Sequence, residues 1–226
     1  MSRQTLTGTC SLCGKHFNRA SMTRHLKTCS LPDPKALVAA APAKSPPSRS
    51  FHLFVEARYA KTYWLDMAVP VEAPLARVDA FLRQIWLECC GHLSAFTIAG
   101  ERYASEAVKD LGESGMQARL GRLLQPGMAF TYEYDYGSTT ELNLKVIGLR
   151  DRRTKQGTVE LLARNDAPQV ACEKCGNQPA TQICTGCVYK DQGWLCENCA
   201  ENHECGTEMC LPVVNSPRAG VCGYTG

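Results

Sequence analysis

Residues 62–90 read TYWLDMAVPVEAPLARVDAFLRQIWLECC and contain the strand-to-helix step that decides the fold. The opening TYWLDMAVPV is rich in aromatic and β-branched side chains, which predicts a strand. Pro74 then suits the first turn of a helix. The apolar residues that follow recur at steps of three and four positions, namely Leu75, Val78, Leu82, Ile85 and Cys89. Gly91 ends this pattern, so the sequence predicts one main helix that packs on a sheet.

Further strand patterns lie on both sides of this helix. FHLFVEARY precedes it, and HLSAFTIAG follows it. After a short helical segment at residues 116–124, MAFTYEYDY and TELNLKVIGLR are typical of strands around a turn at Gly137-Ser138, and GTVELLA is a further candidate strand. We therefore expect residues 51–166 to form a central α+β domain, in which a curved mixed sheet packs on one main helix.

The composition is that of an ordinary globular protein. The chain has 226 residues, of which 44% are hydrophobic and 21% are charged. It holds no apolar run long enough to span a membrane, and no apolar signal segment follows Met1, so we expect a cytoplasmic location. Residues 31–50 contain five prolines and many alanines. Such a composition cannot bury a core, which predicts a linker between residues 1–30 and the central domain.

Fourteen cysteines are distributed unevenly along the chain. Three lie in residues 10–29 and nine in residues 172–222, while the long middle holds only Cys89 and Cys90. Disulfides do not fit a chain without a visible secretory signal, because the cytosol keeps thiols reduced. Metal-binding modules at the two ends of a domain explain the distribution directly. Cys89 and Cys90 are then interpreted as buried residues at the helix end, since a free cysteine behaves as a small hydrophobe.

The first cysteine cluster has the ligand spacing of a small zinc finger. A Cys-x2-Cys knuckle puts two thiolates on one side of an ion, and a His and a Cys four positions apart share one face of a helix. Four such nitrogen and sulfur ligands suit the tetrahedral geometry of zinc. The expected ligands of this finger in residues 1–30 are Cys10, Cys13, His25 and Cys29.

This segment resembles a ββα zinc finger whose last ligand is cysteine. Phe17 and Met22 supply the small apolar core that such a motif needs, and Leu26 adds to it. The spacing between Phe17 and Met22 is one residue shorter than usual, which brings the segment closer to the three-Cys-one-His fingers. These fingers bind protein partners as well as nucleic acids. We expect His16 to lie outside the ligand set, because it precedes the helix.

Charge separates the two ends of the chain. Residues 1–50 carry a net charge of +7, whereas residues 167–226 carry −3. The basic arm favours a polyanion partner, DNA or RNA, although a solvated basic tail is the alternative. Arg19, Arg24 and Lys27 lie on or near the expected finger helix, where they could face phosphates or base edges. A single finger would bind weakly and with strong salt dependence, so a role in protein contacts stays open.

The C-terminal cysteines form three Cys-x2-Cys knuckles, each separated from the next by eight residues. Three knuckles supply six thiolates, which is more than one zinc ion binds. We therefore expect an interleaved cross-brace, in which knuckles one and three hold one ion and knuckle two holds another with the trailing ligands. Interleaving lets each ion order the whole segment. The first set is Cys172, Cys175, Cys196 and Cys199, and the second is Cys184, Cys187, His203 and Cys205, with Cys210 or Cys222 as alternatives for the last ligand.

This spacing resembles the B-box and MYND-type interaction modules. In those modules zinc is structural and the surface binds partner peptides. The resemblance implies that residues 167–226 form a zinc cross-brace module with a protein partner. The acidic balance of the segment argues against nucleic acid at this end. A catalytic zinc keeps one coordination position open, so a surplus of ligands favours closed structural sites. A redox role for the Cys-x2-Cys knuckles is disfavoured because the segment lacks the βαβ context of such sites.

The central residues also resemble a known family, over YWLDMAVPVEAPLARVDAFLRQIWLECCGHLSAFTIAGERY and LGRLLQPGMAFTYEYDYGSTTELNLKVIG. The shared features are the helix from Leu75 to Trp86, the His92-Leu93 pair with Phe96, and the run from Tyr132 to Gly137. They are similar to the bacterial and archaeal plasmid Ri ORF-three-like family, sometimes labelled TnpR-like. The resemblance implies a β-grasp-like α+β fold in a prokaryotic protein, without an established activity. After Gly137 the chain departs from the common form of that family.

Catalytic motifs are absent from the sequence. The central domain has no serine nucleophile with an adjacent base, no paired carboxylates and no phosphate-binding glycine loop. Asp135 is interpreted as a turn-capping carboxylate before Gly137, and His92 as a polar residue at a strand start. We therefore expect a non-enzymatic adaptor with about three zinc ions, which links nucleic acid at the finger to a protein partner at the C-terminal module. The alternative is a DNA-recombination-associated enzyme with its site in the central domain.

Overall fold

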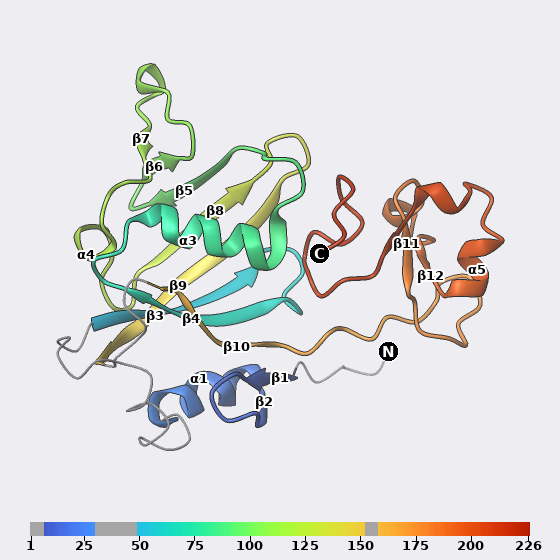
Figure 1. The fold of residues 1–226 in the computed structure, drawn as a ribbon, viewed down its shortest axis with the longest axis horizontal. Coiled ribbons are helices and arrows are strands. Elements are labelled where there is room, and N and C mark those ends of the chain that lie inside the picture. The colour runs from blue at the N-terminus through green and yellow to red at the C-terminus, as the bar shows by residue number, and fades with distance from the viewer. Residues whose placement is uncertain (1–6, 30–48, 152–157) are drawn as a thin grey trace. The chain divides into compact units, whose positions relative to one another are not determined.

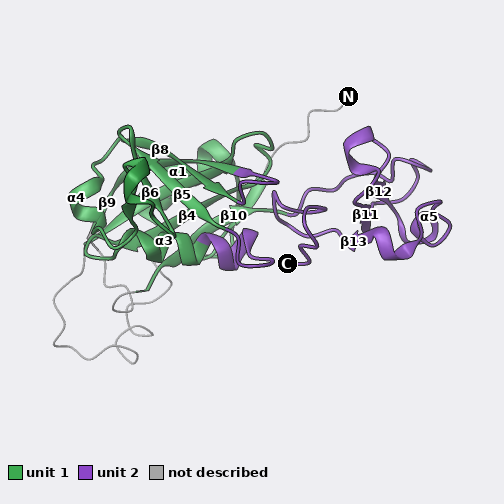
Figure 2. Ribbon diagram, turned by 90° about the horizontal axis from the view of Figure 1, so that it is seen from above, with its two compact units in different colours: residues 1–81, 93–134, 141–166 green, residues 82–92, 135–140, 167–226 purple. Residues whose placement is uncertain are grey.

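The computed structural model describes residues 7–29, 49–151 and 158–226 (Figure 1). They form two compact units, each built from several chain segments (Figure 2). Unit 1 lies within Met1–Phe81, Leu93–Tyr134 and Glu141–Asp166, and unit 2 consists of Leu82–His92, Asp135–Thr140 and Ala167–Gly226. Most of the expected linker, residues 31–48, lies outside the described residues.

Unit 1 is built on a ten-stranded, mostly antiparallel sheet with the strand order β2-β1-β10-β4-β3-β9-β8-β5-β6-β7. The strands are β1 (Thr7–Cys10), β2 (His16–Asn18), β3 (Arg49–Ala57), β4 (Trp64–Pro70), β5 (Ser94–Ile98), β6 (Glu101–Ala104), β7 (Ser114–Gly115), β8 (Ala129–Tyr134), β9 (Thr140–Asp151) and β10 (Glu160–Asn165). Among the pairs recorded, only β6 and β7 run parallel. The chain is thus a mixed α and β protein with one large sheet and few helices.

The helix expected after Pro74 is present, and it changes form before its end. Helix α3 (Leu75–Leu82) continues into a π-helical turn, Arg83–Leu87, so the helical segment stops short of Cys89. Leu75 and Val78 on the apolar stripe are fully buried, and α3 lies across one face of the sheet (Figure 1). The other described helices are α1 (Arg19–Thr28), α4 (Leu120–Leu123) and α5 (Glu197–Glu201), with 3₁₀ turns at Lys109–Leu111, Val188–Lys190 and Thr207–Met209.

None of the described helices combines the length and the apolar character that crossing a bilayer would require.

The finger strands are part of the large sheet. Strand β1 pairs antiparallel with β10, so that Gly8 lies opposite Asn165 and Cys10 opposite Ala163. The backbone N–H of Ser11 also donates to the carbonyl oxygen of Leu162, at 2.8 Å. From the sequence we expected a finger in residues 1–30 and a separate domain in residues 51–166. Strand pairing places the finger in unit 1 together with most of residues 51–166, because β10 offers the finger an open row of backbone hydrogen-bonding groups. Residues 82–92 and 135–140 belong to unit 2.

An apolar cluster shared by the finger and the sheet accompanies this pairing. Its buried members are Cys10, Met22, Leu26, Trp64, Ala68, Leu162 and Ala163. The Trp64 indole is fully buried within it. Gly8 lets β1 come this close, because a Cβ atom at that position would lie 2.5 Å from the Trp64 ring and 2.4 Å from the Arg164 carbonyl oxygen. The finger therefore has no apolar core of its own apart from that of unit 1.

Unit 2 contains a three-stranded sheet of very short strands, in the order β12-β11-β13. They are β11 (Gln182–Cys184), β12 (Trp194–Leu195) and β13 (Cys210–Pro212). The buried cluster beside this sheet consists of Cys172, Cys184, Leu195, Cys196, Cys199 and Ala200. Most of its members are cysteines, so ordinary apolar burial contributes little to holding this part of the chain together.

The C-terminal tail of unit 2 packs on the residues that follow α3. The Ser216 hydroxyl donates to the backbone oxygen of Trp86, at 2.6 Å. The Arg218 side chain is fully buried and donates to the Asp135 carboxylate, at 2.5 Å. Asp135 has a positive φ of 65° and accepts from the backbone N–H of Gly137, at 2.9 Å, which confirms its interpretation as a turn-capping residue.

Candidate metal centres

Four groups of cysteine and histidine side chains each bring their ligand atoms within 4.8 Å of one another. Together they use thirteen of the fourteen cysteines and three of the five histidines. Every group has four ligands, the number that structural zinc sites of this composition use. The groups are Cys10, Cys13, His25 and Cys29; Cys172, Cys175, Cys196 and Cys199; Cys184, Cys187, His203 and Cys205; and Cys89, Cys90, His92 and Cys222.

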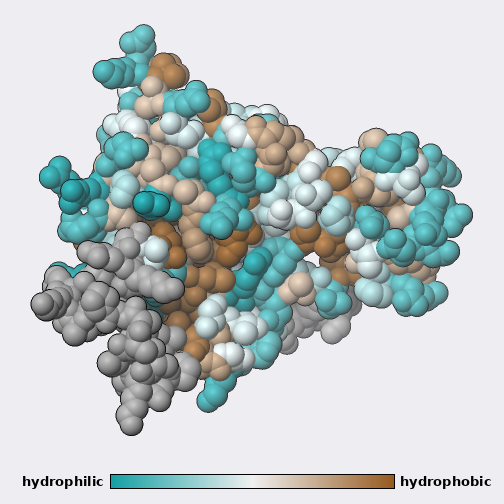
Figure 3. All heavy atoms as spheres, viewed as in Figure 1, coloured by the Kyte–Doolittle hydropathy of each residue, from teal (hydrophilic) through white to brown (hydrophobic). Residues whose placement is uncertain are grey.

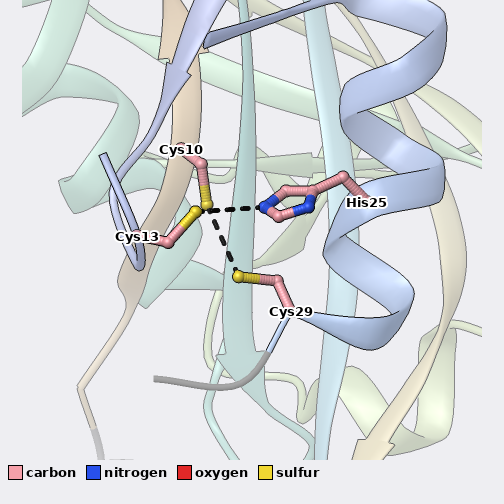
Figure 4. Close-up of side chains that lie close together, drawn as sticks. All are labelled: Cys10, Cys13, His25 and Cys29. Atoms are coloured by element: carbon pink, nitrogen blue, oxygen red, sulfur yellow. Dashed lines mark hydrogen bonds between the residues drawn. The ribbon is translucent and has the colours of Figure 1, made fainter. Parts of the chain in front are cut away.

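In the finger group, Cys10 ends β1 and Cys13 lies in the turn that follows it, while His25 lies in α1 and Cys29 is the residue directly after that helix (Figure 4). The Cys13 sulfur lies 3.3 Å from Nε2 of His25, and the Cys10 sulfur lies 3.9 Å from that of Cys29. Ligands at about 2.3 Å around a tetrahedral zinc ion place sulfurs about 3.8 Å apart. The observed spacing therefore fits one zinc ion at the centre of the four side chains.

Local interactions fix the orientation of the finger ligands. The Asn18 side chain caps the start of α1 by accepting from the N–H of Ser21, at 2.9 Å. At the other end, Arg150 of β9 donates to the Leu26 carbonyl oxygen, at 2.6 Å. The His25 ring stacks on Phe17, with 4.2 Å between the ring centroids. His16 lies outside the group, as expected, with its Nδ1 atom 3.3 Å from the Asp166 carboxylate.

Two groups in unit 2 interleave along the chain as the knuckle spacing predicted. The sulfurs of Cys175 and Cys196 lie 3.8 Å apart, and those of Cys187 and Cys205 lie 3.6 Å apart. These values match the sulfur separation around a zinc ion, whereas a disulfide requires about 2.05 Å. None of the fourteen cysteines, all of which lie among the described residues, forms a disulfide in this structure. The arrangement is compatible with two metal sites of four ligands each.

The thiols of each group lie so close together that ionising all of them is unfavourable unless a cation is bound. Burial raises the pKa of Cys172. Hydrogen bonds from backbone N–H groups, beginning with that of Cys196, together lower it by more, so that the pKa is about 6. In the same group, hydrogen bonding with Cys196 and burial raise the pKa of Cys199 to about 12. Burial and the neighbouring Cys13 likewise raise the pKa of Cys29 to about 12. One thiolate forms readily in such a group, and a divalent cation offsets the cost of ionising the others.

The last ligand of the second C-terminal group is Cys205 rather than either alternative. Cys210 packs beside this group but belongs to none of the four. Cys222, the other alternative, is grouped instead with Cys89, Cys90 and His92. The interpretation of Cys90 as a buried helix-end residue is also wrong, because its side chain is exposed.

The basic residues of the finger divide into two kinds. Arg19 forms an ion pair with Glu56, at 2.7 Å, and its guanidinium lies over the Phe54 ring, 4.9 Å from the centroid. It borders a hollow of about 600 Å³ between α1 and strands β3 and β9. Arg24 and Lys27, in contrast, are exposed. Of the three basic residues named from the sequence, Arg19 is therefore already engaged within unit 1.

Comparisons with known proteins add little to this geometry. No protein-family model matches the chain, and no curated protein matches it. Among solved structures the chain is similar to a protein of unknown function from Methanosarcina mazei Go1, with 14% identity and a TM-score of 0.44. That similarity covers 51% of this chain and 67% of the other.

Proposed function

We propose that this protein is a non-catalytic, zinc-organised adaptor that binds a nucleic acid at its finger and a protein partner at its C-terminal module. The observation that carries the proposal is the composition of the sites. The finger group and the two interleaved groups each supply four Cys or His ligands, enough to fill the tetrahedral positions of a zinc ion. A catalytic zinc keeps one position open, whereas closed sites order a binding surface.

Exposed positive charge around the finger supports the nucleic-acid part of the proposal. Lys15, Arg24 and Lys27 are exposed on or beside the finger, and residues 1–50 carry a net charge of +7. Lysine and arginine at this density attract phosphates without reading sequence. Because Arg19 is paired with Glu56, we assign the contacts to the other three residues.

Two exposed apolar side chains support the protein-binding part. In the cross-brace module, Tyr189 is 76% exposed and Met209 is 39% exposed. Hydrophilic residues dominate the rest of this surface in the view of Figure 3, and the segment carries a net charge of −3. An aromatic side chain within a polar surface is the usual anchor of a small protein interface. A basic or amphipathic peptide is the partner that this surface fits.

Charge reversal at the finger should abolish most of the nucleic-acid affinity. We expect the triple variant Lys15→Glu, Arg24→Glu, Lys27→Glu to weaken binding of a labelled DNA duplex by roughly tenfold or more at low salt, and to reduce the slope of log K against log salt by about 2–3. Fluorescence anisotropy on the full chain measures both quantities. The full chain is needed because β1 depends on β10, which a short N-terminal fragment lacks.

The matched control reverses the same number of charges on other exposed lysines. The variant Lys61→Glu, Lys109→Glu, Lys190→Glu alters net charge equally but leaves the finger intact. We expect it to lower affinity much less than the finger variant does. An equal loss of DNA affinity in the two variants would mean that binding depends on the net charge of the protein and not on the finger. Absence of binding by the unaltered protein at low salt would contradict the nucleic-acid part outright.

A further inference from the structure

A fourth group of ligand atoms gathers where the C-terminal tail meets the segment after the π-helical turn. Cys89, Cys90 and His92 follow that turn closely, while Cys222 comes from the tail. The sulfurs of Cys90 and Cys222 lie 3.7 Å apart, and Nε2 of His92 lies 3.2 Å from the Cys222 sulfur. These separations are those of the other three groups, and they suit a single tetrahedral ion.

The tail reaches this position through its own packing. Ser216 is hydrogen-bonded to the Trp86 backbone, and the buried Arg218 side chain donates to the Ser138 carbonyl oxygen, at 3.1 Å, and to the Thr140 hydroxyl, at 3.2 Å. These contacts fix the chain four residues before Cys222. The fourth ligand is therefore delivered to the other three by protein interactions that need no metal.

The charges around the group are arranged for a thiolate-bound cation. Arg218 donates to the Asp135 carboxylate and also to the Cys89 sulfur, at 3.5 Å. Three thiolates around a divalent cation leave one net negative charge, and the buried guanidinium places a positive charge beside it. Because Asp135 pairs with the same guanidinium, the assembly as a whole keeps one net negative charge. Outer partners of this kind orient the ligands of zinc sites and tune their affinity. Asp135 accepts a hydrogen bond from the guanidinium and so fixes its position. Arg218 and Asp135 therefore support the four ligands without being ligands themselves.

A disulfide between Cys90 and Cys222 explains the arrangement less well. It would require the two sulfurs to move from 3.7 Å to about 2.05 Å, and it would not account for the ligand atoms of Cys89 and His92 lying in the same group. We infer that Cys89, Cys90, His92 and Cys222 form a fourth zinc site, which ties the C-terminal tail to the end of the helical segment. Both Cys90 and Cys222 are exposed, so this ion should exchange faster than the other three.

Metal content of the full-length protein tests the inference. We expect four zinc ions per chain in the protein purified under reducing conditions, and three in either Cys90→Ser or Cys222→Ser, measured by elemental mass spectrometry. A mild chelator should release one zinc rapidly from the unaltered protein, and this fast phase should vanish in both variants. Cys210→Ser is the matched control, because Cys210 belongs to none of the four groups, and it should keep all four ions and the fast phase.

Three zinc ions in the unaltered protein, with no loss in either variant, would overturn the fourth site while leaving the other three sites intact. Four ions and an unchanged fast phase in both variants would place the additional ion elsewhere and would also overturn it. Peptide mapping without reduction provides an independent measurement. A Cys90–Cys222 disulfide in the zinc-loaded protein would contradict the inference, whatever the metal content.

Discussion

Cys196→Ser is expected to release two zinc ions rather than one and to abolish the fixed structure of residues 172–212. The two groups of the cross-brace interleave, so the loss of one ion frees chain segments that also carry ligands of the other. The buried cluster beside them is largely cysteine, with Leu195 and Ala200 as its other members. Zinc binding supplies about 10–16 kcal/mol in zinc-finger peptides. The fully buried Ile183 and Leu195 contribute only about 1.5–3 kcal/mol each, so we expect the metal to dominate the stability of this segment.

Hydrogen exchange and elemental analysis together test this expectation. Amides of β11 and β13 should lose their protection in the variant, while those of β3 and β4 in unit 1 keep theirs. Cys210→Ser removes a sulfur from the same module without removing a ligand, and it should preserve both protection and metal. Native protection across β11 in zinc-free Cys196→Ser protein would show that the module folds by apolar burial, and the cross-brace interpretation would then fail.

Trp64→Ala is expected to destabilise the sheet of unit 1 and the zinc finger together. The indole is fully buried among residues of β1, α1 and β10, and its truncation leaves a large cavity there. Replacing a buried aromatic residue by alanine costs about 3–5 kcal/mol in the free energy of unfolding. Because Met22 and Leu26 of α1 pack in the same cluster, zinc should bind the finger group more weakly in this variant.

Denaturant titration gives the stability change, and competition with a zinc indicator gives the change in affinity. Tyr59→Ala is the control, since this aromatic side chain is 79% exposed, and we expect it to change stability by less than about 0.5 kcal/mol. A large loss of stability in Trp64→Ala with unchanged zinc affinity at the finger would mean that the finger folds independently of the sheet.

The sequence predicted those features that depend on residues close together in the chain. The finger ligands and the three knuckles lie within short segments, where spacing alone sets geometry, and the structure brings them together in the expected groups. The main strands and the helix after Pro74 were likewise readable from local patterns. Neither the β-grasp-like topology nor the TnpR-like resemblance is tested by these findings, and both stay predictions.

Features formed by residues far apart in the chain could not be predicted in this way. Nothing in TGTC at residues 7–10 indicates that it pairs with β10, although Gly8 is the residue that permits the approach. The fourth metal group joins Cys89 to Cys222, and only the Cys-Cys-x-His pattern near Gly91 could have suggested it. The remaining ligand of this group, Cys222, could be identified only from the folded structure.

The pairing of β1 with β10 also has a consequence for the order of events during synthesis. Gly8 is translated long before its partner Asn165, roughly 8–30 s earlier at a typical rate of about 5–20 residues per second. Throughout that interval the finger can bind its metal but has no neighbouring strand, and its backbone edge stays exposed. Completion of the large sheet must therefore be a late step in the biogenesis of this chain.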